Sequence, residues 1–583
     1  MKFFKEKNLC SFTYLNITQF LGALNDNVFK LLIVFFLIDL QGDLHSTSIL
    51  AKSAAIYVIP FLLFSTTAGK LADRLSKRNI IVFSKIMEVA VMALGTIAFA
   101  LKSPFASYTI LFLMALQSAI FSPSKYGIVP EIVSSDRITK ANGILTSFTI
   151  LAMISGTFIA SFITDISGRH FVISSCLCTA LAILGTIASF YIETTPAMGK
   201  KKKFNPFFLY EVYKTLSRAK QENRLFTALI GCSYFLFIAS FIQLNTIPYG
   251  IQSLGLTDTQ GGYLFMLTSL GIASGSILAG RLSGKHVELG LVPIGGLGIA
   301  FTCFLLYFFC NHFFLIIPLF VLLGIFGGLF EVPLESFIQA NSPKNYLGQM
   351  VAATNFLGFL CVLGSSAFLY FNSHILGLQA SEGFIVASLV SFLFTIAFMM
   401  ATLDYFLRFI AFAISRIFFQ LTITNKESSS EGKTPALILC NRPSSWIDAL
   451  LLTAIQRPPL CFLIESTNHD KKLLSFLCRI LRVILVPSGN TVKQRITIYE
   501  KARTSLKKGY TVCIFTKFDN TKENCTNKYL QELQNSFADT SHPIIPISIN
   551  ERLSPTPSKK TVYLFKEFPC HVTIDIGTYQ KRS

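Results

Sequence analysis

Several ionisable side chains interrupt long apolar stretches of this sequence. They are Asp26, Lys30, Lys85, Glu88, Lys125, Glu331 and Glu335. An ionisable group near the centre of a membrane span costs roughly 2.5–3.5 kcal/mol on insertion scales, so each of these groups should face a cavity or a partner. Because both signs of charge are present, a cavity that they line would suit a zwitterionic ligand. These residues are the first candidates for a binding site.

The spacing of two pairs also permits ion pairs within a helix. Asp26 and Lys30 are four residues apart, a spacing at which helical side chains can pair. Lys85 and Glu88 are three apart and can pair likewise. The alternative to ligand binding is that both are internal structural pairs.

The apolar stretches predict an α-helical membrane region. Hydrophobic residues make up 52% of the 583 residues and charged residues 14%, against about 25% charged in a typical soluble protein. From Phe12 to Phe418 the apolar residues form runs of roughly 20, long enough to cross a hydrocarbon core of about 30 Å. Twelve spans are predicted, near residues 12–40, 48–72, 79–101, 104–124, 142–166, 170–192, 225–249, 261–280, 288–310, 313–334, 347–371 and 381–402.

Changes in composition divide the chain into parts. Lys200 to Lys203 separate the sixth span from the seventh, and Arg408 and Arg416 lie among apolar residues as in an interfacial helix. Strand and helix patterns then alternate, which predicts an α/β sheet. The predicted parts are a membrane region over 1–402 with halves at about 1–195 and 222–402, an interfacial helix and linker over 403–426, and a soluble α/β domain over 427–583.

Lysine and arginine in the loops predict the orientation of the chain. The N-terminus, the 2–3, 4–5 and 8–9 loops and the central connector are basic, whereas the alternate loops hold almost no lysine or arginine. Cytoplasmic loops carry this excess. We therefore expect a multi-pass cytoplasmic (inner) membrane protein with both termini and the soluble domain in the cytoplasm.

Composition also excludes several classes of function. The net charge of +20 suits anionic lipid headgroups, and nucleic acid is not a predicted partner because no zinc spacing or basic recognition helix accompanies the charge. The 13 cysteines are scattered without a C-x-x-C pair, so no metal site is predicted. Without a G-x-x-x-x-G-K-[ST] loop the chain has no P-loop for ATP. The chain is therefore not expected to hydrolyse ATP, and no cofactor is predicted.

A ten-residue segment after the second span has a partial repeat after the eighth. It reads GKLADRLSKR from Gly69 to Arg78, and its second copy, Gly280 to Lys285, lacks the aspartate. The first copy resembles the G-x-L-a-D-R-x-G-R-R signature of the major facilitator superfamily. The resemblance implies two six-helix bundles around a central cavity that opens alternately to each side. It implies a role in conformational gating for Gly69, Asp73, Arg74 and Arg78.

Other segments resemble the bacterial lysophospholipid transporters of that superfamily. They are QFLGALNDN at 19–27, FSPSKYGI at 121–128, KANG at 140–143 and GGLFEVPL at 327–334. The resemblance implies that Asp26, Lys30, Lys125, Glu331 and Glu335 bind a lysophospholipid or phospholipid with a headgroup such as phosphoethanolamine. Lys125 is expected near the cytoplasmic mouth, where packing or gating is an equal alternative.

Two positions depart from those transporters. Phe359 stands where they carry a glutamate, and Gln243 stands where an arginine is expected. Both departures leave the exact cargo open.

The soluble domain carries a motif that lacks its expected base. Residues 440–448, CNRPSSWID, resemble the N-H-x-S-x-x-D motif of the glycerolipid acyltransferases, in which a histidine acts as general base and an aspartate orients it. Asp448 is retained as a catalytic remnant, and Pro443 occupies the histidine position. A one-residue slip would place Arg442 there, and a guanidinium cannot accept a proton near neutral pH.

Other motifs of that family are partly retained. The F-P-E-G motif reads FTKF at Phe515 to Phe518, whereas a V-I-P-V pattern remains at Ile544 to Ile547. Arg495 is the implied phosphate-binding residue, and His469 could replace the missing base only if its loop folded over the site. We therefore expect an inactive lipid-binding or regulatory domain.

The leading hypothesis is a transporter that moves lysophosphatidylethanolamine-like lipids across the membrane for re-acylation. A separate acyl-ACP synthetase/acyltransferase is its implied partner. Two alternatives stay open: the domain still acylates lysophospholipid from acyl carrier protein or coenzyme A thioesters, or the chain is a proton-coupled exporter of small molecules.

Overall fold

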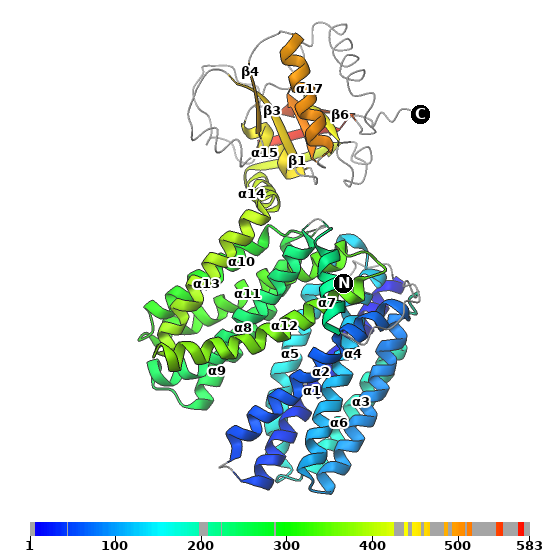
Figure 1. Cartoon of the computed structure of the whole chain (residues 1–583), viewed down its shortest axis with the longest axis vertical. Coiled ribbons are helices and arrows are strands. Elements are labelled where there is room, and N and C mark those ends of the chain that lie inside the picture. The colour runs from blue at the N-terminus through cyan, green and yellow to red at the C-terminus, as the bar shows by residue number, and fades with distance from the viewer. Residues whose placement is uncertain are drawn as a thin grey trace. The chain divides into compact units, whose positions relative to one another are not determined.

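In a computed structural model, the chain forms two compact units, Met1–Thr402 and Leu403–Ser583 (Figure 1). The residues that the structure describes are 6–42, 45–196, 208–222, 224–284, 287–424, 436–440, 446–455, 460–466, 483–487, 492–507, 510–515, 544–551 and 570–576. Each unit is treated separately below.

The first unit is a bundle of long helices. Its first half contains α1 (Glu6–Gln41), α2 (Ser46–Arg74), α3 (Lys77–Ala100), α4 (Pro104–Ile132), α5 (Ile138–Ile166) and α6 (Phe171–Phe190). The second half contains α8 (Leu225–Leu254), α9 (Asp258–Leu282), α10 (Leu291–Phe308), α11 (Phe313–Asn341), α12 (Leu347–Tyr370) and α13 (Ala380–Ala401). Between the halves lies the short helix α7 (Phe208–Ala219). Within the described residues, 12 helices are long and apolar enough to cross a membrane, which confirms the predicted architecture.

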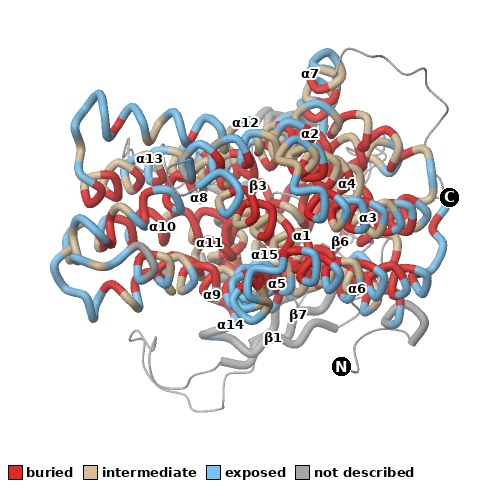
Figure 2. Tube along the Cα trace, turned by 90° about the horizontal axis from the view of Figure 1, so that it is seen from below, coloured by how far each residue is buried: buried red, intermediate tan, exposed pale blue. Residues whose placement is uncertain are grey.

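The burial pattern of this unit suits a bilayer. Figure 2 shows buried residues along the inner faces of the helices and exposed residues around the perimeter. Large apolar side chains such as Phe105 and Phe314 are 82% and 86% exposed. Exposed apolar surface of this extent is expected where a helix contacts hydrocarbon rather than water.

Two helices extend beyond their predicted ends. We expected the fourth span to stop near residue 124 and the tenth near 334, but α4 continues to Ile132 and α11 to Asn341. The added turns of α11 carry polar side chains such as Ser336, which is fully buried. Lys125, which was expected near the cytoplasmic mouth, lies within α4 just past the predicted end of the span.

The halves meet along two antiparallel seams, α2 with α12 and α5 with α9. Glycine permits the close approach in both. A Cβ on Gly69 would lie 2.6 Å from the Gly348 carbonyl oxygen, and one on Gly143 would lie 2.4 Å from that of Ser276. We call the end of the bundle that carries the α2–α3 loop the Asp73 end. Gly69 lies five residues before the end of α2, and Gly143 lies five residues after the start of α5.

The second unit is an α/β domain. It contains α14 (Leu403–Phe418), α15 (Trp446–Ile455) and α17 (Val492–Lys507), and the strands β1 (Phe419–Thr424), β2 (Leu437–Cys440), β3 (Leu460–Ser466), β4 (Val483–Pro487), β5 (Thr511–Phe515), β6 (Ile544–Glu551) and β7 (Cys570–Ile576). The strand order is β1-β7-β6-β2-β5-β3-β4. Neighbouring strands are parallel except β6 and β7. The predicted α/β fold is confirmed.

One segment of this domain differs from the prediction. We expected an interfacial helix and a linker over 403–426, but α14 ends at Phe418 and Phe419–Thr424 forms the strand β1. The β-branched residues Thr422, Ile423 and Thr424 favour a strand, and β7 supplies the parallel partner, with Phe419 opposite Cys570.

Candidate functional site

Asp26 has one carboxylate oxygen available between the helices. It lies on α1, and its Oδ2 accepts a 2.6 Å hydrogen bond from Ser118 on α4. Its Oδ1 is buried without a hydrogen-bond partner. A buried carboxylate oxygen left unpaired is costly, so this atom marks a place where a cationic ligand group would be stabilised.

Lys30 does not form the ion pair that its spacing suggested. No salt bridge joins it to Asp26. Its ammonium instead lies 5.4 Å from the ring centroid of Tyr57 on α2, an arrangement typical of a cation–π contact. The i,i+4 spacing brings Asp26 and Lys30 within electrostatic range of each other, but Ser118 and Tyr57, from neighbouring helices, make the direct contacts to the two charges.

Lys85 and Glu88 form the ion pair that was predicted. The Lys85 ammonium is 2.5 Å from Glu88 Oε2, with both side chains no more than 2% exposed. Asn25 donates to the other Glu88 oxygen at 3.0 Å, and a Cβ on Gly22 would overlap the ammonium at 2.1 Å. Because both charges are enclosed and bonded, the structural alternative describes this pair better than ligand binding does.

A second charged group lies across the interface between the halves. Lys125 on α4 has its ammonium 4.3 Å from the Tyr126 ring centroid. It interacts electrostatically most strongly with Glu335 and Glu331 of α11, and less strongly with Lys85 and Asp26. Glu335 Oε2 is buried without a hydrogen-bond partner. One lysine therefore faces two carboxylates from the opposite half, which leaves an excess of formal negative charge.

The aspartate of the gating motif binds the other half directly. Asp73 accepts hydrogen bonds from the backbone N–H groups of Gly348 and Gln349, at 2.6 and 3.2 Å, and from Gln349 Nε2 at 3.0 Å. These N–H groups lie in the first turn of α12, where unpaired donors and the helix dipole favour an anion. Asp73 thus holds α12 against α2 when the Asp73 end is closed.

The other predicted gating residues are Arg78, Gly69 and Arg74, and each has different surroundings. Arg78 donates to the carbonyl oxygens of Phe190 and Ile192, at 2.9 and 3.2 Å, and so ties α3 to the end of α6. Gly69 provides the close contact between α2 and α12 described above. Arg74 is the last residue of α2 and is half-buried.

Several contacts between the halves were not anticipated. Asn142 on α5 donates at 3.0 Å to both Ser336 Oγ and Gln339 Oε1 of α11. On the α2–α7 side, Lys70 pairs with Glu211 at 3.0 Å. The KANG segment includes Asn142, but no local sequence pattern identifies its partner Gln339, which lies 197 positions away.

Phe359 and Gln243, the two residues that depart from the lysophospholipid transporters, lie in different surroundings. Phe359 stacks on Phe61 of α2 with ring centroids 4.2 Å apart, so an aromatic contact between the halves occupies this position. Gln243 is exposed on α8.

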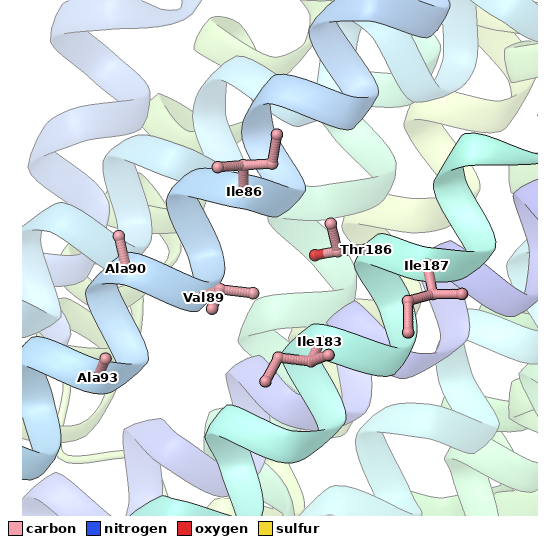
Figure 3. A pocket seen from close by; sticks show the side chains of 7 residues that line it. All are labelled: Ile86, Val89, Ala90, Ala93, Ile183, Thr186 and Ile187. Carbon is pink, nitrogen blue, oxygen red and sulfur yellow. The ribbon is translucent and has the colours of Figure 1, made fainter.

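A hollow of about 390 Å³ lies between α3 and α6 (Figure 3). Its lining is aliphatic, with Ile86, Ile183 and Ile187 half exposed, and its one polar side chain, Thr186, donates to the carbonyl oxygens of Lys85 and Ala182. With its only hydroxyl already bonded, this hollow offers nothing to a charged headgroup.

The acyltransferase-like motif is described only in part. Asp448 lies in the first turn of α15 and is 2% exposed. Pro443, Arg442, His469 and residues 516–518 lie outside the described residues, and Arg495 lies on α17 without a described side chain. Burial, with Cys440 nearby, raises the pKa of the Cys513 thiol well above its usual value, so this sheet cysteine is an unreactive core residue.

Comparisons with known families agree with this division of the chain. The family model described as Major Facilitator Superfamily matches residues 15–366. The family model described as Acyltransferase matches residues 420–550.

Among curated proteins, the chain is similar to lysophospholipid transporters named LplT. That of Escherichia fergusonii is 26% identical over 344 residues, covering 58% of this chain and 83% of that protein. That of Enterobacter sp. is 28% identical over 349 residues, covering 58% of this chain and 82% of that protein. The similarity therefore falls on the membrane region.

Solved structures with the same fold include two transporters. The transporter FucP in the outward conformation has a TM-score of 0.55 at 13% identity, over 67% of this chain and 99% of its own. The human organic anion transporter MFSD10 (TETRAN) has a TM-score of 0.53 at 14% identity, over 67% of this chain and 99% of its own. At these identities the likeness extends to the fold alone.

Proposed function

Since this chain belongs to the major facilitator superfamily, we propose that it moves lysophospholipids such as lysophosphatidylethanolamine across the cytoplasmic membrane for re-acylation. The similarity to named lysophospholipid transporters supports this cargo. The absence of a P-loop motif in the sequence supports secondary or downhill transport.

The arrangement of Asp26 and Lys30 supports the proposal most strongly. Asp26 has a buried, unpaired carboxylate oxygen, and Lys30, one helical turn away, has a cation–π contact with Tyr57 and no salt bridge to a carboxylate of the described residues. A phosphoethanolamine headgroup carries an ammonium and a phosphate, which can pair with these two groups respectively.

The lysine and arginine residues of the loops support a cytoplasmic position for the Asp73 end. On this assignment, the contacts of Asp73, Asn142 and Asn355 with the opposite half close the cytoplasmic side. The conformation is then one that receives cargo from the outer side.

A flipping assay tests the cargo. Purified protein in liposomes should move fluorescent lysophosphatidylethanolamine faster than empty liposomes do. Asp26→Asn should slow the initial rate by about 10- to 150-fold, because a hydrogen bond to a charged group contributes about 1.5–3 kcal/mol.

The control is Asp39→Asn on the same helix. Asp39 is exposed and pairs with Arg169 at 2.7 Å, so its variant should move lipid at the wild-type rate. Equal rates for the Asp26 and Asp39 variants would exclude Asp26 from headgroup binding, and no movement above empty liposomes would refute lysophospholipid transport.

We further propose that the C-terminal domain binds lipid without acylating it. Pro443 replaces the histidine base, and Asp448 alone cannot activate a lysolipid hydroxyl without the imidazole that it would orient. A separate acyl-ACP synthetase/acyltransferase would then complete re-acylation. Mass spectrometry should detect no diacyl product after incubation with lysophospholipid and acyl donor. A product that Asp448→Ala abolishes would overturn this assignment.

A further inference from the structure

The aromatic contact between α2 and α12 divides the charged residues of the interface into two groups. Phe61 lies 12 residues before Asp73, and Phe359 lies 11 residues after Gly348. We call the stacked rings of Phe61 and Phe359 the stack. At ~1.5 Å per residue, the stack is roughly 17 Å from the Asp73–Gly348 contact along either helix. The two helices thus run side by side from the Asp73 end to this stack.

Helix α4 fixes the level of the stack relative to the charges. Ala115 and Ala119 of α4 pack with Phe61 and Phe359 in one apolar cluster. Ser118, between them, binds Asp26. Lys125 lies seven residues further along α4, about 10 Å nearer the Asp73 end. Asp26 is therefore level with the stack, and Lys125 lies beyond it.

Polar contacts between the halves begin just past the stack. Asn355, one turn from Phe359 on α12, donates to Ser122 of α4 at 2.8 Å. The hydrogen bonds of Asp73 and Asn142 to the opposite half lie further toward the Asp73 end. On the other side of the stack, Tyr57 continues the aromatic row, 5.6 Å from Phe61 between ring centroids.

We propose that Phe61 and Phe359 form the barrier between two headgroup subsites on one transport path. The outer subsite is Asp26 with Lys30, and the inner subsite is Lys125 with Glu331 and Glu335. Because the rings come from opposite halves, separation of α2 from α12 opens the barrier. This inference rests on the proposed lipid transport.

The chemistry of each side explains why a barrier is needed. A charged headgroup cannot cross a closed apolar stack without losing its hydration, which carries a large penalty. The inner subsite has two carboxylates against one ammonium, so it favours the ammonium of the headgroup. The headgroup passes from the outer pair to the inner cluster only when the rings part.

A native cysteine reports whether the barrier is intact. Cys232 on α8 is 5% exposed and lies within electrostatic range of Glu335 and Glu331. Like the thiol of Cys513, this enclosed thiol is unreactive while buried, so it is labelled only when the barrier parts and water reaches it. In liposomes, a membrane-impermeant maleimide is added from the side opposite the Asp73 end. Mass spectrometry of the peptide that contains Cys232 then gives its labelling rate separately from the other cysteines.

Phe359→Ala should raise the labelling rate of Cys232 by between about 2- and 12-fold, the range that corresponds to a typical aromatic pair. The matched control is Phe368→Ala on the same helix, since Phe368 contacts Phe237 and Phe241 within its own half. Equal labelling of Cys232 in the Phe359→Ala and Phe368→Ala proteins would overturn the barrier.

This labelling does not depend on cargo. A failure of the lipid-flipping assay would refute the proposed function, whereas the labelling rates alone decide whether the stack shields the inner subsite.

Discussion

Replacing Asp73 by asparagine should open the Asp73 end. The carboxylate makes three hydrogen bonds to the first turn of α12, at 2.6, 3.0 and 3.2 Å. A hydrogen bond to a charged group contributes about 1.5–3 kcal/mol and a neutral one about 0.5–1.5 kcal/mol. Loss of the charge also removes about 0.3–1 kcal/mol from the helix dipole.

The three weakened bonds and the lost dipole interaction together amount to about 3.3–5.5 kcal/mol against the closed state. The ratio of open to closed molecules should then rise by roughly 200- to 8,000-fold. Spin labels at the exposed positions Leu75 and Lys344 would follow this change by double electron–electron resonance, with longer distances marking the open state.

The control is Asp165→Asn. Asp165 is exposed at the far end of α5, so its variant should give the wild-type distance distribution. Identical distributions for the Asp73→Asn and Asp165→Asn proteins would refute the account of Asp73 as the contact that holds the seam.

Three further substitutions test the interior. Lys85→Met leaves Glu88 as an uncompensated buried charge and should lower stability by about 3–5 kcal/mol, measured as a lower melting temperature in detergent. The double variant that also carries Glu88→Gln should regain most of this stability. No recovery would argue against the ion pair. Asn142→Ala should lower stability by about 1–3 kcal/mol, and an unchanged melting temperature would show that its bonds to α11 contribute little. Glu335→Gln should reduce the preference for lysophosphatidylethanolamine over lysophosphatidylglycerol in the flipping assay, whereas an unchanged preference would remove Glu335 from headgroup selection.

Much of the fold could be predicted from local patterns in the sequence. The twelve spans follow from apolar runs whose length matches a bilayer, and the alternation of strands and helices after Leu437 follows from their different periodicities. The prediction failed at Phe419–Thr424, because this segment directly follows α14 and its partner strand begins only at Cys570.

The site was harder to anticipate because distant segments build it. Helical spacing correctly paired Lys85 with Glu88, where Asn25 on α1 completes the bonding. The i,i+4 spacing brings Asp26 and Lys30 only within electrostatic range of each other, since spacing states only that two residues can meet. Ser118, 92 positions from Asp26, decides the outcome.

The central claim is that a lysophospholipid headgroup binds between the two halves at Asp26. Lysophosphatidylethanolamine with a photoreactive group on its headgroup can be cross-linked to the full chain in liposomes and mapped by peptide mass spectrometry. Cross-links should concentrate on α1 around Asp26 and on α4 around Ser118, and Asp26→Asn should remove most of them while Asp39→Asn leaves them. Cross-links confined to the exposed perimeter, or equal in both variants, would contradict the claim.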